Sequence, residues 1–288
     1  MVGAAADYAT LGIEPHAIKP WEDGLRTDGS AGTYEWWYFD AHLDDGAKLV
    51  VVFYTKEFSD IDRPPAPAIR LELTLHDGTQ ADRLVHLDPA TFSASTETCD
   101  VRIGDNVFAG DLRTYTIRAE VEGVSVDVTL TGQVPAWRPE TGHVLFGEQG
   151  EQYFAWLPSV PQGAVEATYS VNGHTSTTTG IGYHDHNWGN APMLKLMHHW
   201  YWARGAAGPY SVIASYITAE KAYGHTELPI FMPARDGQLI ADDSTKVTFE
   251  ELGRYTDTTT GKRSATSPAT PTRTATSGTW SHGPATPT

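Results

Sequence analysis

The sequence has one cysteine, Cys99, among its 288 residues. An intramolecular disulfide needs two thiols, and cysteine-based zinc cages need two or more, so both are excluded within these residues. Basic residues are also few, because 20 Lys and Arg stand against 36 Asp and Glu, which gives a formal charge of −16. Nucleic acids and anionic membranes bind positive surfaces, so we expect neither as a partner.

Long apolar runs are missing as well. The start, MVGAAADYATLGIEP, lacks the basic and apolar regions of a secretory signal. No run approaches the roughly 20 apolar residues of a membrane-spanning helix. We therefore expect a cytoplasmic protein without a transmembrane segment. The sequence also lacks the G-x-x-x-x-G-K-[ST] loop and the G-x-S-x-G turn, so neither a nucleotide cofactor nor a serine nucleophile is expected.

Strand periodicity is what the sequence has in abundance. Apolar residues alternate with polar ones through IRLELTL, residues 69–75. Four patterns predict β-hairpins, with turns at residues 44–46, 122–123, 172–173 and 205–209. Such a series predicts an all-β fold of antiparallel sheets, closed into a barrel or stacked as a sandwich.

Composition predicts four segments along the chain. Residues 1–20 form a lead segment, residues 21–190 a first β domain and residues 191–263 a second one. Residues 264–288 contain no Val, Ile, Leu or Phe and are rich in Thr, Ser and Pro. Such a segment cannot bury enough apolar surface to offset its ordering entropy, so we expect disorder there.

The densest chemistry lies in GIGYHDHNWG, residues 180–189. His184 and His186 are two residues apart, so both lie on one face of a strand and form a possible pair of metal ligands. No Glu follows before Glu220, and the adjacent His198 and His199 diverge if the chain there is extended. We therefore expect no metal.

Acid/base chemistry is the stronger reading of the same motif. Tyr183 and Asp185 share the strand face opposite the two histidines. An aspartate that is buried beside a tyrosine has a raised pKa, as a general acid requires near neutral pH. The alternative is that Asp185 only braces the turn at residues 187–189.

Together with EWWYF at residues 35–39, the GYHDHNWG block resembles a lipocalin-like family. This family includes the carotenoid 1,2-hydratases (hydroxyneurosporene synthases), the AttH-like proteins, kievitone hydratase and the fungal decalin-forming Diels–Alderases. The resemblance covers residues 32 to about 255 and implies two lipocalin-like antiparallel β-barrel domains, a hydrophobic cavity and no cofactor. It implies that Asp185 is the essential acid, with Tyr183 beside it and Trp156 as the family's upstream tryptophan. This sequence has Phe154 where the resemblance implies a histidine.

The second barrel is expected to be incomplete, because the chain passes into Thr- and Pro-rich sequence after Arg263. A truncation or a change of reading frame would explain this departure from the family pattern.

We therefore expect a cofactor-independent enzyme that hydrates or cyclises C=C bonds of a hydrophobic polyene, isoprenoid or polyketide by acid catalysis. The alternatives are a pericyclase of the Diels–Alderase type and a non-catalytic carrier of hydrophobic ligands. The oligomeric state is left open. Asp185, Tyr183 and Trp156 are the expected catalytic residues. The expected substrate-binding residues are Glu35, Trp36, Trp37, Tyr38, His184, His186, Asn187, Trp188, Trp200 and Trp202. Among these, we expect His184 and His186 to support the other residues of the site and to take no part in the reaction.

Overall fold

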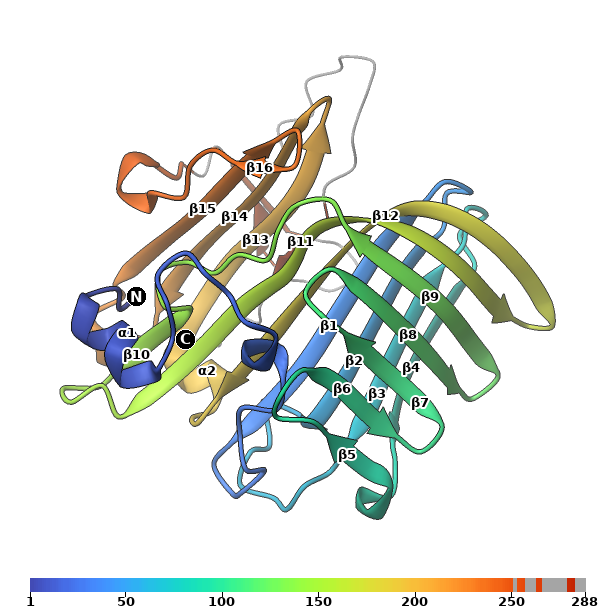
Figure 1. The fold of residues 1–288 in the computed structure, drawn as a ribbon, viewed down its shortest axis with the longest axis horizontal. Coiled ribbons are helices and arrows are strands. Elements are labelled where there is room, and N and C mark those ends of the chain that lie inside the picture. Colours follow the sequence, from blue (N-terminus) through green and yellow to red (C-terminus); the bar gives the residue numbers. More distant parts are fainter. Residues whose placement is uncertain (251–252, 257–262, 266–278, 283–288) are drawn as a thin grey trace. The chain divides into compact units, whose positions relative to one another are not determined.

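The computed structural model describes residues 1–250, 253–256, 263–265 and 279–282. The chain divides into two compact units, Met1–Met193 and Leu194–Thr288, whereas composition predicts the division after residue 190. Nearly all of the described regular structure is antiparallel β-strand (Figure 1), so the all-β fold class is confirmed. No helix in the described part of the chain is long and apolar enough to cross a membrane. The α-helices are α1 (Ala5–Leu11) and α2 (Met193–Leu196), and the 3-10 helices are η1 (Pro20–Asp23), η2 (Pro89–Thr91), η3 (Lys221–Tyr223) and η4 (Ser244–Lys246).

The first unit contains one large antiparallel sheet that curls into a half-barrel (Figure 1). Its hydrogen-bonded order is β4-β3-β2-β1-β12-β11-β9-β8-β7-β6-β5, and β10 pairs with β11 beside this path. Among the described pairings, the end strands β4 and β5 do not meet each other, so the closed barrel implied by the family resemblance is here an open one. The strands are β1 (Tyr34–Leu43), β2 (Lys48–Lys56), β3 (Ala68–Thr74), β4 (Gln80–His86), β5 (Phe92–Ala94), β6 (Cys99–Ile103), β7 (Asn106–Gly110), β8 (Thr114–Val121), β9 (Val124–Gly132), β10 (His143–Phe146), β11 (Gln152–Val171) and β12 (His174–Gly189).

Tight turns join these strands as the sequence predicts. Asn172 and Gly173 have φ angles of 52° and 78°, and they connect β11 to β12. Glu122 and Gly123, at 46° and 77°, connect β8 to β9 in the same way. Positive φ at both central residues gives a turn whose twist matches that of the flanking strands. The local sequence therefore sets the register of both hairpins.

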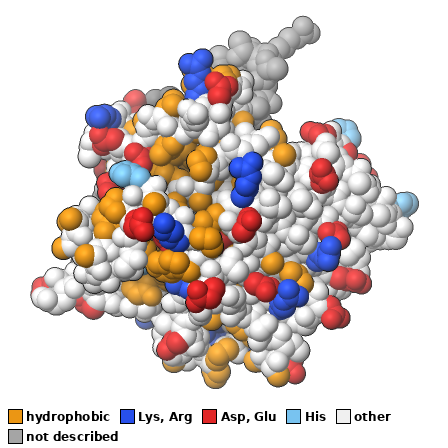
Figure 2. All heavy atoms as spheres, viewed as in Figure 1, with side chains coloured by type: hydrophobic (Ala, Val, Ile, Leu, Met, Phe, Trp, Pro, Cys, Tyr) orange, Lys and Arg blue, Asp and Glu red, His pale blue; other side chains and the backbone are white. Residues whose placement is uncertain are grey.

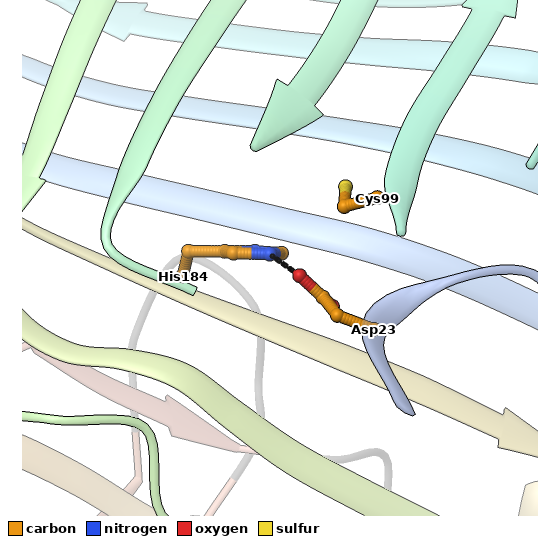
Figure 3. Close-up of side chains that lie close together, drawn as sticks. All are labelled: Asp23, Cys99 and His184. Carbon is orange, nitrogen blue, oxygen red and sulfur yellow. Dashed lines mark hydrogen bonds and ion pairs between the residues drawn. The ribbon is translucent and has the colours of Figure 1, made fainter. Parts of the chain in front are cut away.

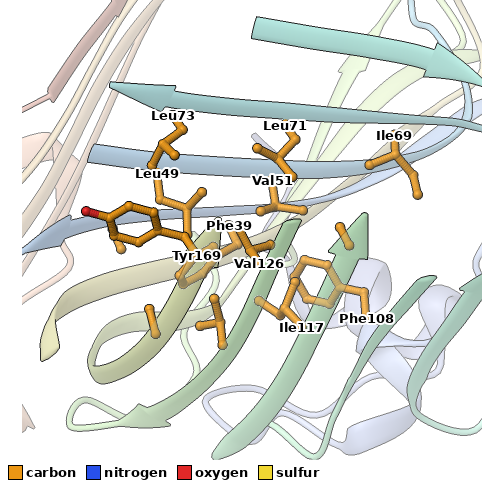
Figure 4. Packing of buried hydrophobic residues seen from close by; sticks show 14 of the residues in the cluster. Phe39, Leu49, Val51, Ile69, Leu71, Leu73, Phe108, Ile117, Val126 and Tyr169 are labelled. Atoms are coloured by element: carbon orange, nitrogen blue, oxygen red, sulfur yellow. The ribbon is translucent and has the colours of Figure 1, made fainter. Parts of the chain in front are cut away.

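The core of the first unit lies on the concave face of the half-barrel (Figure 4). Alternate residues of β1 and β2, such as Phe39 and Val51, point into it and have 0% exposure. Strand β3, which pairs with β2, contributes Leu71, and strand β7 contributes Phe108, both also at 0% exposure. Burial of a large aliphatic or aromatic side chain contributes about 1.5–3 kcal/mol, so this layer stabilises the half-barrel.

The second unit contains a five-stranded antiparallel sheet in the order β16-β15-β14-β13-β19 and a separate two-stranded sheet. Strand β19 falls within the segment predicted to be disordered, where it pairs with β13. A segment of four residues whose backbone pairs with a neighbouring strand can be ordered even where the average composition is polar. Most of residues 264–288 lies outside the described part of the chain. The strands are β13 (Met197–Ala207), β14 (Tyr210–Ala219), β15 (Glu227–Arg235), β16 (Gln238–Leu239), β17 (Arg254–Thr256), β18 (Arg263–Ala265) and β19 (Thr279–His282).

The acidic composition is visible on the surface. On the face shown in Figure 2, Asp and Glu side chains are widely scattered, and Lys and Arg side chains lie among them. The formal charge of −16 therefore does not arise from one acidic segment alone.

Candidate active site

Strand β12 carries the GYHDHNWG motif and presents its side chains to two faces of the large sheet. Strand β1 pairs with it so that Tyr38 lies opposite Asp185. Because side chains alternate along a strand, Tyr183 and Asp185 lie on one face, and His184 and His186 lie on the other. We call these the acid face and the histidine face. Strand periodicity in the sequence predicts the same division.

Asp185 accepts hydrogen bonds from three side chains. Its Oδ2 accepts from the Tyr183 hydroxyl at 2.7 Å and from Trp156 Nε1 at 2.7 Å. Its Oδ1 accepts from Asn187 Nδ2 at 2.6 Å. Tyr183 and Asn187 come from β12 itself, and Trp156 comes from the neighbouring strand β11. The structure thus brings the three predicted catalytic residues together and adds Asn187 as a direct partner of the acid.

Burial shifts the proton affinity of Asp185. Asp185 is 7% exposed, and burial raises the pKa of its carboxyl group to about 6, although its hydrogen bonds from Tyr183 and Trp156 oppose the increase. A pKa near the working pH lets a carboxyl group both give and take a proton. Asp185 therefore has the proton affinity of a general acid/base.

The Tyr183 hydroxyl is the partner that can follow a change in protonation of Asp185. A hydroxyl donates one hydrogen bond and accepts others, whereas an indole N–H only donates. Tyr183 can donate to the carboxylate and, after rotation of its O–H bond, accept from the neutral acid. Trp156 Nε1 lies 3.3 Å from the Tyr183 hydroxyl oxygen and can donate to it as well.

Aromatic rings fix these two donors. Trp137 packs edge-on against Trp156, with ring centroids 6.1 Å apart and planes at 84°. Tyr38 packs edge-on against Tyr183 at 6.3 Å. Each aromatic pair of this kind stabilises its geometry by about 0.5–1.5 kcal/mol beyond the burial of area. The rings therefore restrict where the donors of Asp185 can point.

Trp36 and Phe154 extend the aromatic surface of the acid face. Trp36 lies opposite Asn187 in the β1–β12 register, and its ring centroid is 6.4 Å from that of Phe154. Phe154 occupies the position where the family resemblance implies a histidine. A phenyl ring can neither activate water nor carry a proton, so the basic group implied there is absent from this position.

A second group of polar side chains lies on the histidine face around Asp23, the last residue of η1. Asp23 Oδ2 accepts from the Tyr115 hydroxyl at 2.5 Å and lies 3.2 Å from His184 Nε2. Asp23 Oδ1 lies 3.5 Å from His186 Nδ1. Burial alone would raise the pKa of Asp23, but His184, then His186 and Tyr115, lower it below its ordinary value. Asp23 is therefore held as a buried carboxylate.

Glu35 completes this group from strand β1. Its Oε1 accepts from the backbone N–H of Arg26 at 2.7 Å and lies 2.7 Å from His186 Nε2. Its Oε2 accepts from the backbone N–H and the hydroxyl of Thr27, at 2.8 and 2.7 Å. The Trp37 ring stacks on His186 with centroids 4.7 Å apart. These contacts fasten the chain before β1 to the sheet.

The two faces separate the predicted substrate-binding residues. On the histidine face, four of them are fully buried and belong to the polar and aromatic group described above, and their contact with a substrate stays a prediction: Glu35, Trp37, His184 and His186. Trp188 also lies on that face, packed against His186 and 8% exposed. Trp200 and Trp202 lie on β13 in the second unit, where both are partly buried. Contact of Trp36, Tyr38, Asn187, Trp200 and Trp202 with a substrate stays a prediction.

Asp23, Cys99 and His184 have the spacing of metal ligands, since their ligand atoms lie within 4.8 Å of one another (Figure 3). Their chemistry fits an ion poorly. Burial raises the pKa of the Cys99 thiol well above its usual range, so it stays protonated, and Sγ lies 3.6 Å from the Phe108 carbonyl oxygen as a donor. His184 uses Nδ1 at the Tyr38 carbonyl oxygen, 2.9 Å away, and Nε2 at Asp23. We therefore assign the three side chains to the polar group of the histidine face.

Sequence reasoning missed Asp23 and Tyr115, which are 92 residues apart and joined by a hydrogen bond. No local pattern predicts such a contact. The available signal was the pair Glu22-Asp23 after Pro20, because two acids in so short a helix need partners if they are buried. Arg138 supplies one of them, with Nη1 2.9 Å from Glu22 Oε2.

Comparisons with known proteins agree with this architecture. A model of the Diels-Alderase-like family matches residues 26–263. The quinolone epoxide rearrangement protein asqO of Emericella nidulans is 31% identical over 199 residues, which cover 64% of this chain and 54% of that protein. The Diels-Alderase ucsH of an Acremonium species is 25% identical over 227 residues, 72% of this chain and 54% of that protein. The chain thus spans about half the length of both relatives.

Solved structures show the same fold at lower sequence identity. An AttH structure from Nitrosomonas europaea superposes with a TM-score of 0.64 at 17% identity, covering 86% of this chain and 79% of that one. Kievitone hydratase from Nectria haematococca gives a TM-score of 0.55 at 15% identity, covering 86% and 74%. The lipocalin-like architecture implied by the sequence motifs is therefore confirmed.

Proposed function

Because this chain belongs to the Diels-Alderase-like family, we propose that it is an enzyme that cyclises or rearranges a hydrophobic natural-product intermediate, with Asp185 as general acid and base. The observation that carries this proposal is the environment of Asp185. The side chain is buried, has a pKa raised to about 6, and receives hydrogen bonds from Tyr183, Trp156 and Asn187. A group so placed can transfer a proton and stabilise the charge that remains.

The proposed step begins with neutral Asp185. Its proton moves to an oxygen or an alkene carbon of the substrate, and the electron pair of the broken O–H bond stays on the carboxylate. Three donors then stabilise that carboxylate. The substrate cation closes a ring or shifts a bond, and Asp185 takes a proton back from the product cation. General acid/base catalysis of this kind contributes about 10²–10⁴-fold in rate.

Two observations favour cyclisation or rearrangement over hydration. The relatives asqO and ucsH are named for an epoxide rearrangement and a Diels–Alder reaction. Hydration also needs a base that activates water, and Phe154, an apolar ring, occupies the position where the family resemblance implies a histidine. We therefore place hydration second among the acid-catalysed reactions, and carotenoid hydration is one special case of it.

A pericyclase without proton transfer is the second candidate, supported by the relative ucsH. Such an enzyme accelerates reaction by holding a folded conformer, which contributes up to about 7–11 kcal/mol in favourable cases. Asp185 then only donates or accepts a hydrogen bond. A plain carrier is less well supported, because a buried carboxyl with a raised pKa costs stability and a carrier gains nothing from it.

Asp185→Asn tests the proposal. The probes are a quinolone epoxide and a linear polyene with a tethered alkene, incubated with the full chain and analysed by mass spectrometry. We expect turnover of the epoxide to fall about 10²–10⁴-fold, because the amide keeps the shape and loses the acidic proton. Asp127→Asn, at an exposed site on β9, serves as the matched control and should leave turnover unchanged.

The outcomes separate the candidates. A fall of less than about tenfold with product still formed would favour the pericyclase. Binding of both probes without turnover by the unaltered protein would favour the carrier. Reaction in deuterated water gives a further check, because alkene protonation places deuterium on product carbon and hydration additionally adds the mass of water.

A further inference from the structure

The hydrogen bonds to Asp185 are divided unequally between its two carboxyl oxygens. Oδ2 accepts from the Tyr183 hydroxyl and from Trp156 Nε1, both at 2.7 Å. Oδ1 accepts from Asn187 Nδ2 at 2.6 Å, and no other donor among the described residues reaches it. A carboxylate offers about four lone-pair positions, two on each oxygen. Both positions of Oδ2 are therefore occupied, and one position of Oδ1 is left.

A proton on Oδ1 fits the three donors as they stand. A neutral carboxyl group has a carbonyl oxygen, which accepts hydrogen bonds, and a hydroxyl oxygen, which donates one and can still accept. With Oδ1 as the hydroxyl oxygen, Oδ2 keeps both of its donors and Oδ1 keeps Asn187. No neighbouring side chain has to rotate when the proton arrives or leaves.

A proton on Oδ2 would disturb the same contacts, because it needs one of the two occupied positions. The indole N–H of Trp156 cannot become an acceptor. The Tyr183 hydroxyl would therefore have to turn and accept the proton, which moves its own O–H bond away from the carboxyl group. Placing the proton on Oδ2 thus requires a rearrangement at every transfer, whereas placing it on Oδ1 requires none.

We propose that the proton transferred by Asp185 is carried on Oδ1 and that Asn187 is the residue that positions it. This inference rests on the proposed function, in which Asp185 is the acid. Asn187 holds Oδ1 at one lone-pair position and leaves the other for the proton. Tyr183 and Trp156 have a different task, because they stabilise the negative charge of the carboxylate from the Oδ2 side.

The assignment also says from which end the substrate meets the acid. The atom that takes the proton has to approach Oδ1, the oxygen held by Asn187, and Trp36 lies opposite Asn187 in the β1–β12 register. The Trp36 ring is partly buried, and its centroid is 5.5 Å from that of Phe58 and 6.4 Å from that of Tyr54. The proton is therefore presented at the end of the carboxyl group nearest these rings.

Infrared spectroscopy of the full chain tests the assignment without any substrate. The C=O stretch of a neutral carboxyl group falls in frequency with each hydrogen bond that its carbonyl oxygen accepts. The spectrum is recorded at about pH 5, where Asp185, with a pKa of about 6, is mostly neutral. The band of Asp185 is identified as the one that Asp185→Asn removes. With the proton on Oδ1, the carbonyl oxygen is Oδ2.

Single substitutions distinguish the two oxygens. Tyr183→Phe and Trp156→Phe each remove a donor from Oδ2, so each should raise the C=O frequency. Asn187→Ala removes the donor of Oδ1 and should leave the frequency nearly unchanged; Asn187→Leu, closer in volume, replaces it if the alanine variant unfolds. Tyr169→Phe removes a hydroxyl that donates to Asp45 Oδ2 at 2.7 Å, and it serves as the matched control without a shift.

The opposite pattern, with a shift in the Asn187 variant alone, would place the proton on Oδ2 and overturn the proposal. Similar shifts in all three variants would show a proton shared between the oxygens, and no shift in any of them would show that these donors do not hold the neutral acid. Either result also contradicts the assignment.

Turnover of the epoxide probe gives a second readout for Asn187. Asn187→Ala should lower kcat by up to about 10²-fold and leave KM little changed, because a misoriented proton slows the chemical step without weakening binding. A rise in KM with kcat unchanged would make Asn187 a binding residue and refute its positioning role. The expected spectra without turnover by the unaltered protein would refute the proposed function and still confirm the position of the proton.

Discussion

At the scale of single residues, Asp185 is subject to two opposing influences. Burial favours the neutral acid, and hydrogen bonds from Tyr183, Trp156 and Asn187 favour the carboxylate. The result is a pKa of about 6, between the value of a solvated aspartate and that of an aspartate buried without donors. Removal of any one of these donors should therefore raise the pKa of Asp185.

Trp156→Phe tests the effect of one donor on this pKa. The variant keeps an aromatic ring and removes the Nε1–H donor, so the pKa of Asp185 should rise above its present value. A hydrogen bond to a charged group contributes about 1.5–3 kcal/mol, which corresponds to roughly 1–2 pKa units. The pH profile of turnover, or the carboxyl signal in nuclear magnetic resonance, would report the shift. Trp21→Phe, which removes an indole elsewhere in the same unit, should leave the profile in place.

At the scale of elements, the pairing of β12 with β1 depends on glycine. A Cβ atom added at Gly180 would lie 2.3 Å from the His42 carbonyl oxygen and 2.8 Å from the Leu43 Cα. Both atoms belong to the backbone of β1, so neither can move without shifting the strand. This close approach explains why glycine interrupts an otherwise β-branched strand before the site.

Gly180→Ala should therefore destabilise the first unit by about 1–3 kcal/mol, as overpacking of a tight site does. Urea unfolding followed by tryptophan fluorescence measures the change. Gly205→Ala makes the same substitution within β13, where nothing lies within 4 Å of the added Cβ. That variant should be neutral or slightly stabilising, and equal losses in both variants would contradict the role given to Gly180.

The pairing of β1 with β12 also depends on Glu35, whose two oxygens together accept from Arg26, Thr27 and His186. Glu35→Gln would replace one accepting oxygen by a donor that faces other donors. Breaking a buried, hydrogen-bonded charge commonly costs about 3–5 kcal/mol, and we expect a loss of this size in urea unfolding. Glu72→Gln removes a half-exposed partner of Arg70 and should cost less than about 1 kcal/mol.

The hairpin turns, and the strand face on which each side chain lies, can be predicted from the sequence because both depend on residues close together in the chain. Asn172-Gly173 fixes a turn, and the two-residue period of β12 separates Asp185 from His184 before any tertiary contact is known. The register shift at His198 has no such signal, so adjacent histidines that are expected to diverge instead meet. Local rules thus predict regular strands well and bulges poorly.

At the scale of the whole molecule, Asp185 should leave a signature in the pH dependence of stability. Its folded-state pKa of about 6 exceeds the ordinary 3.8, so the folded state binds more protons between these values. Stability from this group is therefore greatest below about pH 4 and falls as pH rises toward about 6. A shift of about two units corresponds to roughly 3 kcal/mol at neutral pH.

Asp185→Asn should remove this penalty. The free energy of unfolding at pH 7.5 should increase by up to roughly 3 kcal/mol over the unaltered protein. The gain should shrink toward zero near pH 4, where the aspartate is already neutral. The Asn187 amide can rotate to accept from the new amide, which limits any loss of hydrogen bonding. Urea unfolding at several pH values measures the difference, and a loss of stability at every pH would contradict it.

Residues of the candidate site that belong to a recognisable motif could be predicted from the sequence, whereas contacts between distant parts of the chain could not. Tyr183 and Asp185 follow from the motif on β12, and Trp156 follows from the family resemblance alone; the structure joins the three by hydrogen bonds. The contact between Asp23 and Tyr115 could not be predicted, because only the tertiary fold brings η1 against β8. Composition also predicted disorder where Thr279–His282 forms a strand, because an average over many residues does not resolve four.

The long hairpin of β11 and β12 has a practical consequence. Asp185 follows Asn172 by 13 residues, a path of roughly 43 Å along the curled chain at about 3.3 Å per residue, and the Asn172-Gly173 turn is exposed. A fluorophore, an affinity tag or a surface linker attached at this turn would be separated from Asp185 by most of the length of the hairpin. The turn therefore offers an attachment point for immobilising the protein or for following it by fluorescence.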